Sequence, residues 1–214
     1  MFSIMNTSIS ILQKVLLTSG LLAPLLYFGT DRLVGHLIPG YSFSAQSISD
    51  LSAIGSPQRW LAVLLTVAAC VFMTAFGVGI WLISDQVLLL RAVSVLIIGN
   101  AIPGLIATLF FPTHYEVRPN FVSTGVLIMF SSVLCSILAM VLGAIAIKGW
   151  FRIFSISIPT AFILFAILRF ATEKNSPAGE AVSLIGAQER TMSYSYLLWV
   201  FVLSIYLWSL WLKE

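Results

Sequence analysis

The sequence predicts an all-α polytopic membrane protein, in which six transmembrane helices form one bundle. Only 9% of its 214 residues are charged, whereas a soluble domain carries about 25%. Hydrophobic residues make up 59% of the chain, and the mean hydropathy is +1.03. Polar surface is therefore too scarce to cover a water-soluble globule, and the long apolar runs must face lipid or one another.

The first three spans are assigned by length, because roughly 20 apolar residues cross a hydrocarbon core about 30 Å thick. The first predicted span covers residues 13–31 and is bounded by charged residues, whose long side chains can reach the headgroups. The second (60–83) and the third (92–111) hold no charge. Asn100 and Pro103 predict a kink or a packing contact inside the third span.

The last three spans complete the bundle. Residues 121–147 are long enough to cross with tilt, and residues 151–169 form a shorter run that is interrupted by Pro159. Tryptophan and tyrosine residues crowd the ends of residues 191–212, as is typical of a membrane interface. The chain 1–214 is thus predicted to be a single transmembrane domain.

An even number of spans places both termini on one side of the membrane and the loops after spans one, three and five on the other. Basic residues are divided almost equally between the two sides. The short turns after spans two and four carry basic residues and only one acid, Asp85, which favours cytoplasmic termini.

The first long loop is predicted to contain a short interfacial helix. Its sequence "SISD" has the spacing of a capping box, with Ser47 as the N-cap and Asp50 as its partner. Ile48, Leu51 and Ile54 would then share one face, which would lie in the interface or against the bundle.

The three long loops gather most polar side chains on one side, and we interpret this polar face as the functional surface. The function expected is the binding of a lipid headgroup or of another membrane protein. No run of basic residues is present for nucleic acid to bind, and the sequence specifies no oligomeric state. The candidate ligand residues are Asp31, Arg32, Ser47, Ser49, Asp50, Glu116, Arg118, Glu189 and Arg190.

Two other functions stay open at this point. A lipid-modifying enzyme would use Asp50, His36, His114 and Glu189 near the headgroups, although capping explains the aspartate equally well. These histidines and carboxylates lack the spacing of a metal site, so neither a metal nor a cofactor is predicted. A small-solute transporter would use the kink at Asn100.

Three segments carry a resemblance to a known family: "PGYSFSAQSISDLSAIGSP", "LFFPTHYEVRP" and "GAQER". Together they resemble the domain of unknown function 998 (DUF998) family of prokaryotic membrane proteins, which implies six spans in a plasma membrane and no assigned activity. The positions that match the family pattern are Ile48, Ser49, Leu51, Gly55, Pro57, Phe111, Pro112, Gly186 and Arg190.

The chain departs from that family at the entrance to span four, where many members carry a histidine. Here the residues are Arg118, Pro119, Asn120 and Phe121. The segment "ISDLSAIGSP" is also similar to the eukaryotic membrane family that includes glycosylphosphatidylinositol-lipid remodelling factors. This second similarity favours a function that involves lipids.

Overall fold

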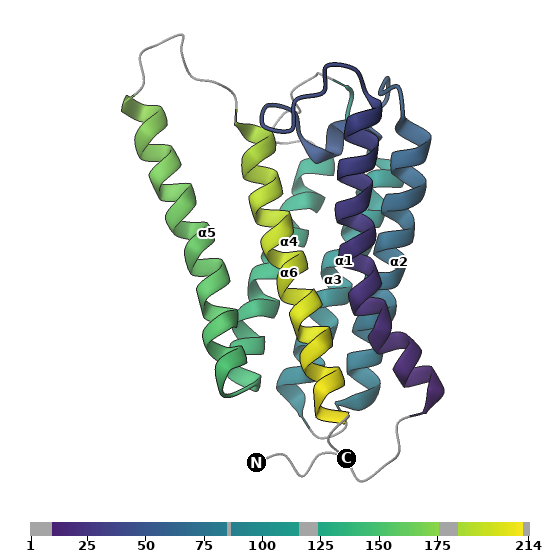
Figure 1. The fold of residues 1–214 in the computed structure, drawn as a ribbon, viewed down its shortest axis with the longest axis vertical. Coiled ribbons are helices and arrows are strands. Elements are labelled where there is room, and N and C mark those ends of the chain that lie inside the picture. The colour runs from purple at the N-terminus through teal and green to yellow at the C-terminus, as the bar shows by residue number, and fades with distance from the viewer. Residues whose placement is uncertain (1–9, 85–86, 116–123, 176–183, 212–214) are drawn as a thin grey trace.

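The structure is a computed structural model, and it is all-α (Figure 1). It describes residues 10–84, 87–115, 124–175 and 184–211. The helices are α1 (Ile11–Leu37), the 3-10 helix η1 (Ile48–Ser52), α2 (Arg59–Ile83), α3 (Leu88–Phe110), α4 (Thr124–Ala146), α5 (Trp150–Asn175) and α6 (Ile185–Trp211).

Four of the described helices are long and apolar enough to cross a membrane. They are α1, α2, α3 and the segment Gly186–Leu210 of α6. In α4 the segment Phe130–Ala146 is a shorter apolar helix. The all-α class is therefore confirmed, and these helices are consistent with the integral membrane protein that the composition predicts.

The helices form a ring in chain order. Each helix packs against its neighbours in sequence, and α6 closes the ring onto α1 (Figure 1). Small residues let the helices approach closely: a Cβ atom on Gly20 of α1 would lie 2.5 Å from the Phe76 ring of α2. On the opposite side of the ring, the buried Trp199 of α6 fits over Gly143 of α4 and donates a hydrogen bond to Ser155 Oγ of α5 at 2.8 Å.

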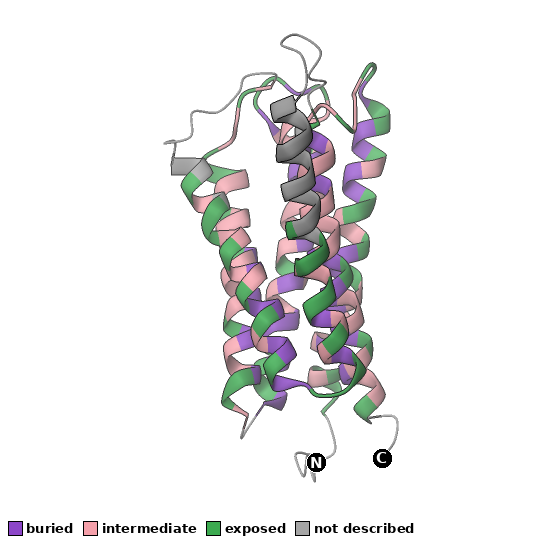
Figure 2. Cartoon of the chain, turned by 90° about the vertical axis from the view of Figure 1, so that its left-hand side faces the viewer, coloured by how far each residue is buried: buried purple, intermediate pink, exposed green. Residues whose placement is uncertain are grey.

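Buried and exposed residues alternate along the helices (Figure 2). Most buried apolar residues form one cluster to which all six helices contribute, and a second, smaller cluster lies where the first loop packs on α1 and α2. Large apolar side chains such as Leu25 and Leu198 are more than half exposed on the outer surface. Lipid tails solvate such side chains, so this surface is the one expected to face the bilayer.

Several helices extend beyond the predicted limits of their spans: α3 begins at Leu88 instead of residue 92, and α5 continues to Asn175 instead of ending at residue 169. The largest shifts with a clear cause are in α1 and α6. The first span was predicted to end at residue 31, but α1 continues to Leu37. The last was predicted to begin at residue 191, but α6 begins at Ile185. The boundaries were placed at charged residues, and the structure buries two of those charges, Asp31 and Arg190, against each other inside the helical region.

The predicted helix in the first loop is the 3-10 helix η1. Its capping box is confirmed, because the Ser47 hydroxyl accepts the Asp50 N–H and the Asp50 carboxylate accepts the Ser47 N–H. Ile48 and Leu51 are buried against the ends of α1 and α2. The placement of Ile54 on the same face is wrong: the backbone is already extended at residue 53, and Ile54 is 44% exposed.

The first and third loops are joined, as the even number of spans predicted. The N–H of Ile54 donates to the carbonyl of Thr113 at 2.8 Å, and the N–H of Tyr115 donates to the carbonyl of Ile54 at 2.9 Å. The Gln46 amide also donates to the Tyr115 hydroxyl at 3.2 Å. Residues 176–183 of the fifth loop lie outside the described residues.

Candidate functional site

Arg190 near the start of α6 is the centre of a buried polar network. Its Nε and Nη2 atoms donate to the two carboxylate oxygens of Asp31 at 3.0 and 2.7 Å, a bidentate ion pair between α6 and α1. The Tyr194 hydroxyl donates to the same carboxylate. Both charged residues are almost completely buried, so the pair is satisfied by protein groups instead of water.

The remaining donors of Arg190 hold the first loop. Nη1 donates to the carbonyls of Phe43 and Gln46 at 2.7 Å each, and Nη2 donates to the Tyr41 hydroxyl at 2.7 Å. Tyr41 in turn donates to the carbonyl of Ser47 at 2.7 Å. Burial raises the pKa of the Tyr41 phenol, which keeps it protonated for that role. Every guanidinium donor of Arg190 is therefore used within the chain.

The segment "GAQER" acts as a clamp on the first loop. A Cβ atom at Gly186 would lie 2.0 Å from the Gln46 carbonyl oxygen, so only glycine permits this close approach. Glu189 accepts the N–H of Ile48 at 3.0 Å, and Arg190 donates to the carbonyls of Phe43 and Gln46 in the same loop. We call Gly186, Glu189 and Arg190 the loop clamp.

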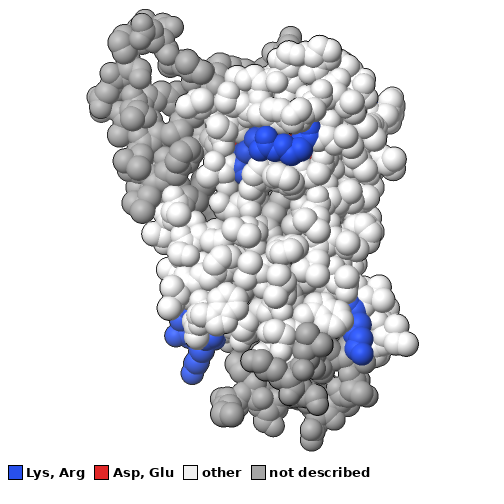
Figure 3. Space-filling view, in the orientation of Figure 1, with Lys and Arg blue, Asp and Glu red and all other residues white. Residues whose placement is uncertain are grey.

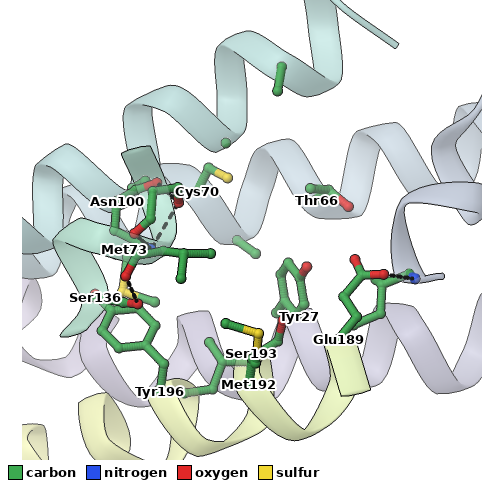
Figure 4. A pocket seen from close by; sticks show the side chains of 18 of the residues that line it. Tyr27, Thr66, Cys70, Met73, Asn100, Ser136, Glu189, Met192, Ser193 and Tyr196 are labelled. Carbon is green, nitrogen blue, oxygen red and sulfur yellow. Dashed lines mark hydrogen bonds between the residues drawn. The ribbon is translucent and has the colours of Figure 1, made fainter. Parts of the chain in front are cut away.

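Beneath the first loop lies a cavity of about 280 Å³, close to the lower limit of about 300 Å³ for small-molecule sites. All six helices and η1 contribute to its wall. The lining is mostly apolar, with polar groups at its two ends (Figure 4). Such a cavity inside a ring of apolar helices is suited to an amphiphilic ligand.

The end of the cavity nearest the first loop is lined by one carboxylate and several hydroxyl groups. Glu189 lies there with Tyr27 and Thr66 (Figure 4), and Ser49 and Ser193 also line the cavity. Glu189 is half-buried, and its Oε2 atom accepts the Ile48 N–H. Among the described lining residues none is lysine, arginine or histidine.

The deeper end holds amide and hydroxyl groups from α3, α4 and α6. Asn100 donates to the carbonyl and the hydroxyl of Ser132 at 2.9 Å each, which joins α3 to α4. Tyr196 lines the same cavity, and its hydroxyl is buried without a hydrogen-bond partner in the described part of the chain. A buried hydroxyl without a partner costs about 1–3 kcal/mol, so this group is available to a ligand or to water.

Four of the candidate ligand residues serve the internal structure. Asp31 and Arg190 bind each other, and Ser47 and Asp50 form the cap of η1. Ser49 and Glu189 are the candidates that line the cavity.

The other candidates lie away from the cavity. Arg32 is half-buried on the outer side of α1 among aromatic rings, and it does not line the cavity. His36 is exposed and bonded through Nδ1 to the carbonyl of Arg32, while His114 is exposed opposite Ile54. Of the four catalytic candidates, Glu189 alone lines the cavity. Glu116 and Arg118 fall outside the described residues.

Sequence reasoning missed most of the cavity residues because they sit inside apolar spans. A usable signal exists in their spacing, since residues at i, i+4 and i+7 share one face of a helix. In α6 these positions are Glu189, Ser193 and Tyr196, and all three line the cavity. In α3, Asn100 and Thr108 are two helical repeats apart and also line it.

Comparison with protein families gives one match, to the family described as protein of unknown function (DUF998), which covers residues 21–206. The chain belongs to the DUF998 family. The match includes both the loop clamp and the cavity. Searches of curated proteins and of solved structures found no match to this DUF998 protein. Within the described residues, no group of three or more His, Cys, Asp and Glu side chains is placed to hold a metal ion.

Proposed function

We propose that this DUF998 protein spans the membrane six times and binds one amphiphilic membrane lipid in the cavity beneath its first loop. The polar end of the lipid lies at Glu189, and an apolar chain extends toward Tyr196. The observation that carries the proposal is the cavity itself, which is apolar along most of its wall and polar at its loop end. With the termini in the cytoplasm, as predicted, the cavity would lie toward the opposite side of the membrane.

The lengths of α4 and α5 support the count of six spans. At 1.5 Å per residue, the 23 residues of α4 and the 26 residues of α5 are about 34 and 39 Å long, which exceeds a hydrocarbon core of about 30 Å. Both helices pack in the same ring as the four helices that qualify as spans. They also supply part of the cavity wall.

A lipid can reach the cavity from the bilayer on the side of α5. Ile158, Pro159 and Ile163 of this helix line the cavity, and Ile163 is also 53% exposed. In Figure 1, α5 lies at the outer edge of the bundle, beside α6. We therefore place the entrance of the lipid beside Ile163, where a lining residue is accessible.

The charges of the lining indicate which polar end the site accepts. Glu189 is a carboxylate that no lysine, arginine or histidine of the described lining neutralises. An anionic ligand brings no counter-charge to this buried carboxyl group, whereas an ammonium group would stabilise its ionised form. An ammonium or hydroxyl group would also donate a hydrogen bond to Glu189 and neighbouring hydroxyls. We therefore assign the ligand to amphiphiles with an amine or hydroxyl polar end.

The variant Glu189→Gln tests this assignment, because glutamine still offers an oxygen to the Ile48 N–H but carries no charge. We expect a long-chain amine to bind the wild type and to bind Glu189→Gln about tenfold more weakly, since a charge-assisted hydrogen bond contributes about 1.5–3 kcal/mol. A long-chain alcohol of equal length should bind both proteins similarly. Binding is measured by native mass spectrometry in a mild detergent.

The matched control is Asp50→Asn, which changes another carboxylate to an amide at the loop side without altering the cavity lining. It should retain the amine affinity of the wild type. Equal amine binding by the wild type and Glu189→Gln, or preference of the wild type for a long-chain carboxylic acid, would contradict the assignment.

A further inference from the structure

Arg32 holds a positive charge on the outer surface, away from the cavity. Its guanidinium carbon lies 4.8 Å from the centre of the Phe43 ring, and the rings of Phe28 and Tyr194 lie 5.5 and 5.6 Å away. Stacking on aromatic rings uses the faces of a guanidinium and leaves the N–H donors on its edge available. The structure gives this guanidinium no hydrogen bond and no ion pair with any described residue.

The nearest carboxylate in sequence does not neutralise Arg32. Both oxygens of Asp31 already accept hydrogen bonds, from Arg190 and from the Tyr194 hydroxyl. Asp31 is thus paired with Arg190, and the positive charge of Arg32 remains. On the described surface of this side of the molecule, Figure 3 shows an isolated basic patch near the loop end, between α1 and α6, with no acidic atoms beside it.

An apolar surface continues from this charge toward the middle of the bundle. On α1 the residues that follow Arg32 along the same face, at helical spacing, are Phe28, Leu25 and Leu21. On α6 the corresponding face carries Tyr194, Leu198, Phe201 and Ile205. The two faces meet where the Phe28 and Tyr194 rings pack 5.1 Å apart, and Leu25, Leu198 and Ile205 are about half exposed.

We propose that this face of α1 and α6 binds an anionic phospholipid. The phosphate oxygens accept hydrogen bonds from the edge of the Arg32 guanidinium, which suits a phosphate geometrically, and the acyl chains lie along the two apolar faces. Charge complementarity selects this occupant, because a zwitterionic headgroup brings no net negative charge. This site is separate from the cavity, and a phospholipid could bind here whether or not the cavity holds a ligand.

The test compares phosphatidylglycerol with phosphatidylcholine of identical acyl chains, titrated onto the purified full-length protein and counted by native mass spectrometry. We expect the wild type to prefer phosphatidylglycerol. In Arg32→Gln its affinity should fall roughly fivefold, the effect of about one cation at a membrane surface, while phosphatidylcholine binding is unchanged. Equal binding of the two lipids by the wild type would overturn the proposal.

The control variant is Arg59→Gln, which removes another arginine at the loop end of the bundle that stacks on Trp60. It should retain the preference for phosphatidylglycerol, whereas a loss equal to that of Arg32→Gln would show general charge attraction and overturn the site. Soluble glycerol phosphate should not displace the lipid at matched concentration, and displacement would assign the site to a small anion instead.

A second variant guards against a folding defect. Arg32→Lys keeps the charge but loses the planar donors. We expect it to discriminate between the two lipids less than the wild type and more than Arg32→Gln, with thermal unfolding in detergent close to that of the wild type. Discrimination equal to the wild type would show that the charge alone suffices and would contradict the stacked geometry.

Discussion

Arg190 illustrates how a charged side chain is held inside a bundle of apolar helices. Its guanidinium bonds to Asp31, Tyr41 and backbone carbonyls of the first loop, so no donor is left for a ligand. Removing one partner of such a buried pair leaves the other charge without compensation. The pair therefore links α1, α6 and the first loop.

We expect Arg190→Ala to lower the free energy of unfolding by about 3–5 kcal/mol, the cost of breaking a buried ion pair from one side. The measurement is reversible unfolding of the purified protein in mixed micelles. Arg59→Ala is the control, because the Arg59 guanidinium stacks on Trp60 and has no ion pair with a described residue, so it should contribute about 1 kcal/mol or less. A loss no larger than that of the control would show that the buried pair does not stabilise the fold.

At this scale the sequence identified the residues but not their partners. Asp31 and Arg190 were both selected as polar residues at span ends, yet they are 159 residues apart and nothing local pairs them. The assignment of Asp50 to a cap was predictable because the capping box lies within four residues. Glu189 was selected for its charge, but its place at a cavity depends on the packing of six helices.

At the scale of elements, the junction between α6 and the first loop determines the roof of the cavity. Gly186 lets the loop backbone pass close to α6, Glu189 and Arg190 bind that backbone, and η1 then covers the cavity with Ile48 and Ser49. The order of these residues in "GAQER" follows from this contact. About one turn of α6 must carry the glycine, which leaves room for the loop backbone, and the two charged side chains that bind it.

Gly186→Ala should displace the first loop, because its Cβ atom would meet the Gln46 carbonyl oxygen, a backbone group that cannot rotate away. We expect faster hydrogen exchange of the amides in residues 42–48 and a lower unfolding temperature. Gly29→Ala is the matched control, since a Cβ atom there meets nothing within 4 Å. Alanine in a helix should leave that variant as stable as the wild type or up to about 1 kcal/mol more stable. If residues 42–48 exchange at the same rate in both variants, the clamp does not position the loop.

The first loop also shows which parts of an element can be predicted locally. The capping box fixed where η1 begins, but its end after Ser52 and the extended backbone at Ile54 depend on hydrogen bonds with Thr113 and Tyr115 of the third loop. The helical periodicity assumed for Ile54 was overridden by this contact between loops.

At the scale of the whole molecule, the order of helices was predictable because bilayer thickness sets a length that can be read from the sequence. The cavity was not, because its existence depends on which faces the helices turn inward and on where α5 stands at the edge of the bundle (Figure 1). Membership of the DUF998 family does not indicate an activity, because the family is described as having no known function. The cavity, its acidic lining residue and its position beside α5 are therefore the features that indicate a function.

The most direct test of the central claim is the lipid content of the protein purified in mild detergent, compared between Ala107→Phe and Ile106→Phe. Ala107 lines the cavity, so phenylalanine should fill it, whereas the adjacent Ile106 is 37% exposed and does not line the cavity. We predict that the wild type and Ile106→Phe retain one tightly bound lipid per chain and that Ala107→Phe loses it while remaining folded. Equal lipid content in all three folded proteins would contradict the claim that the cavity is a lipid site.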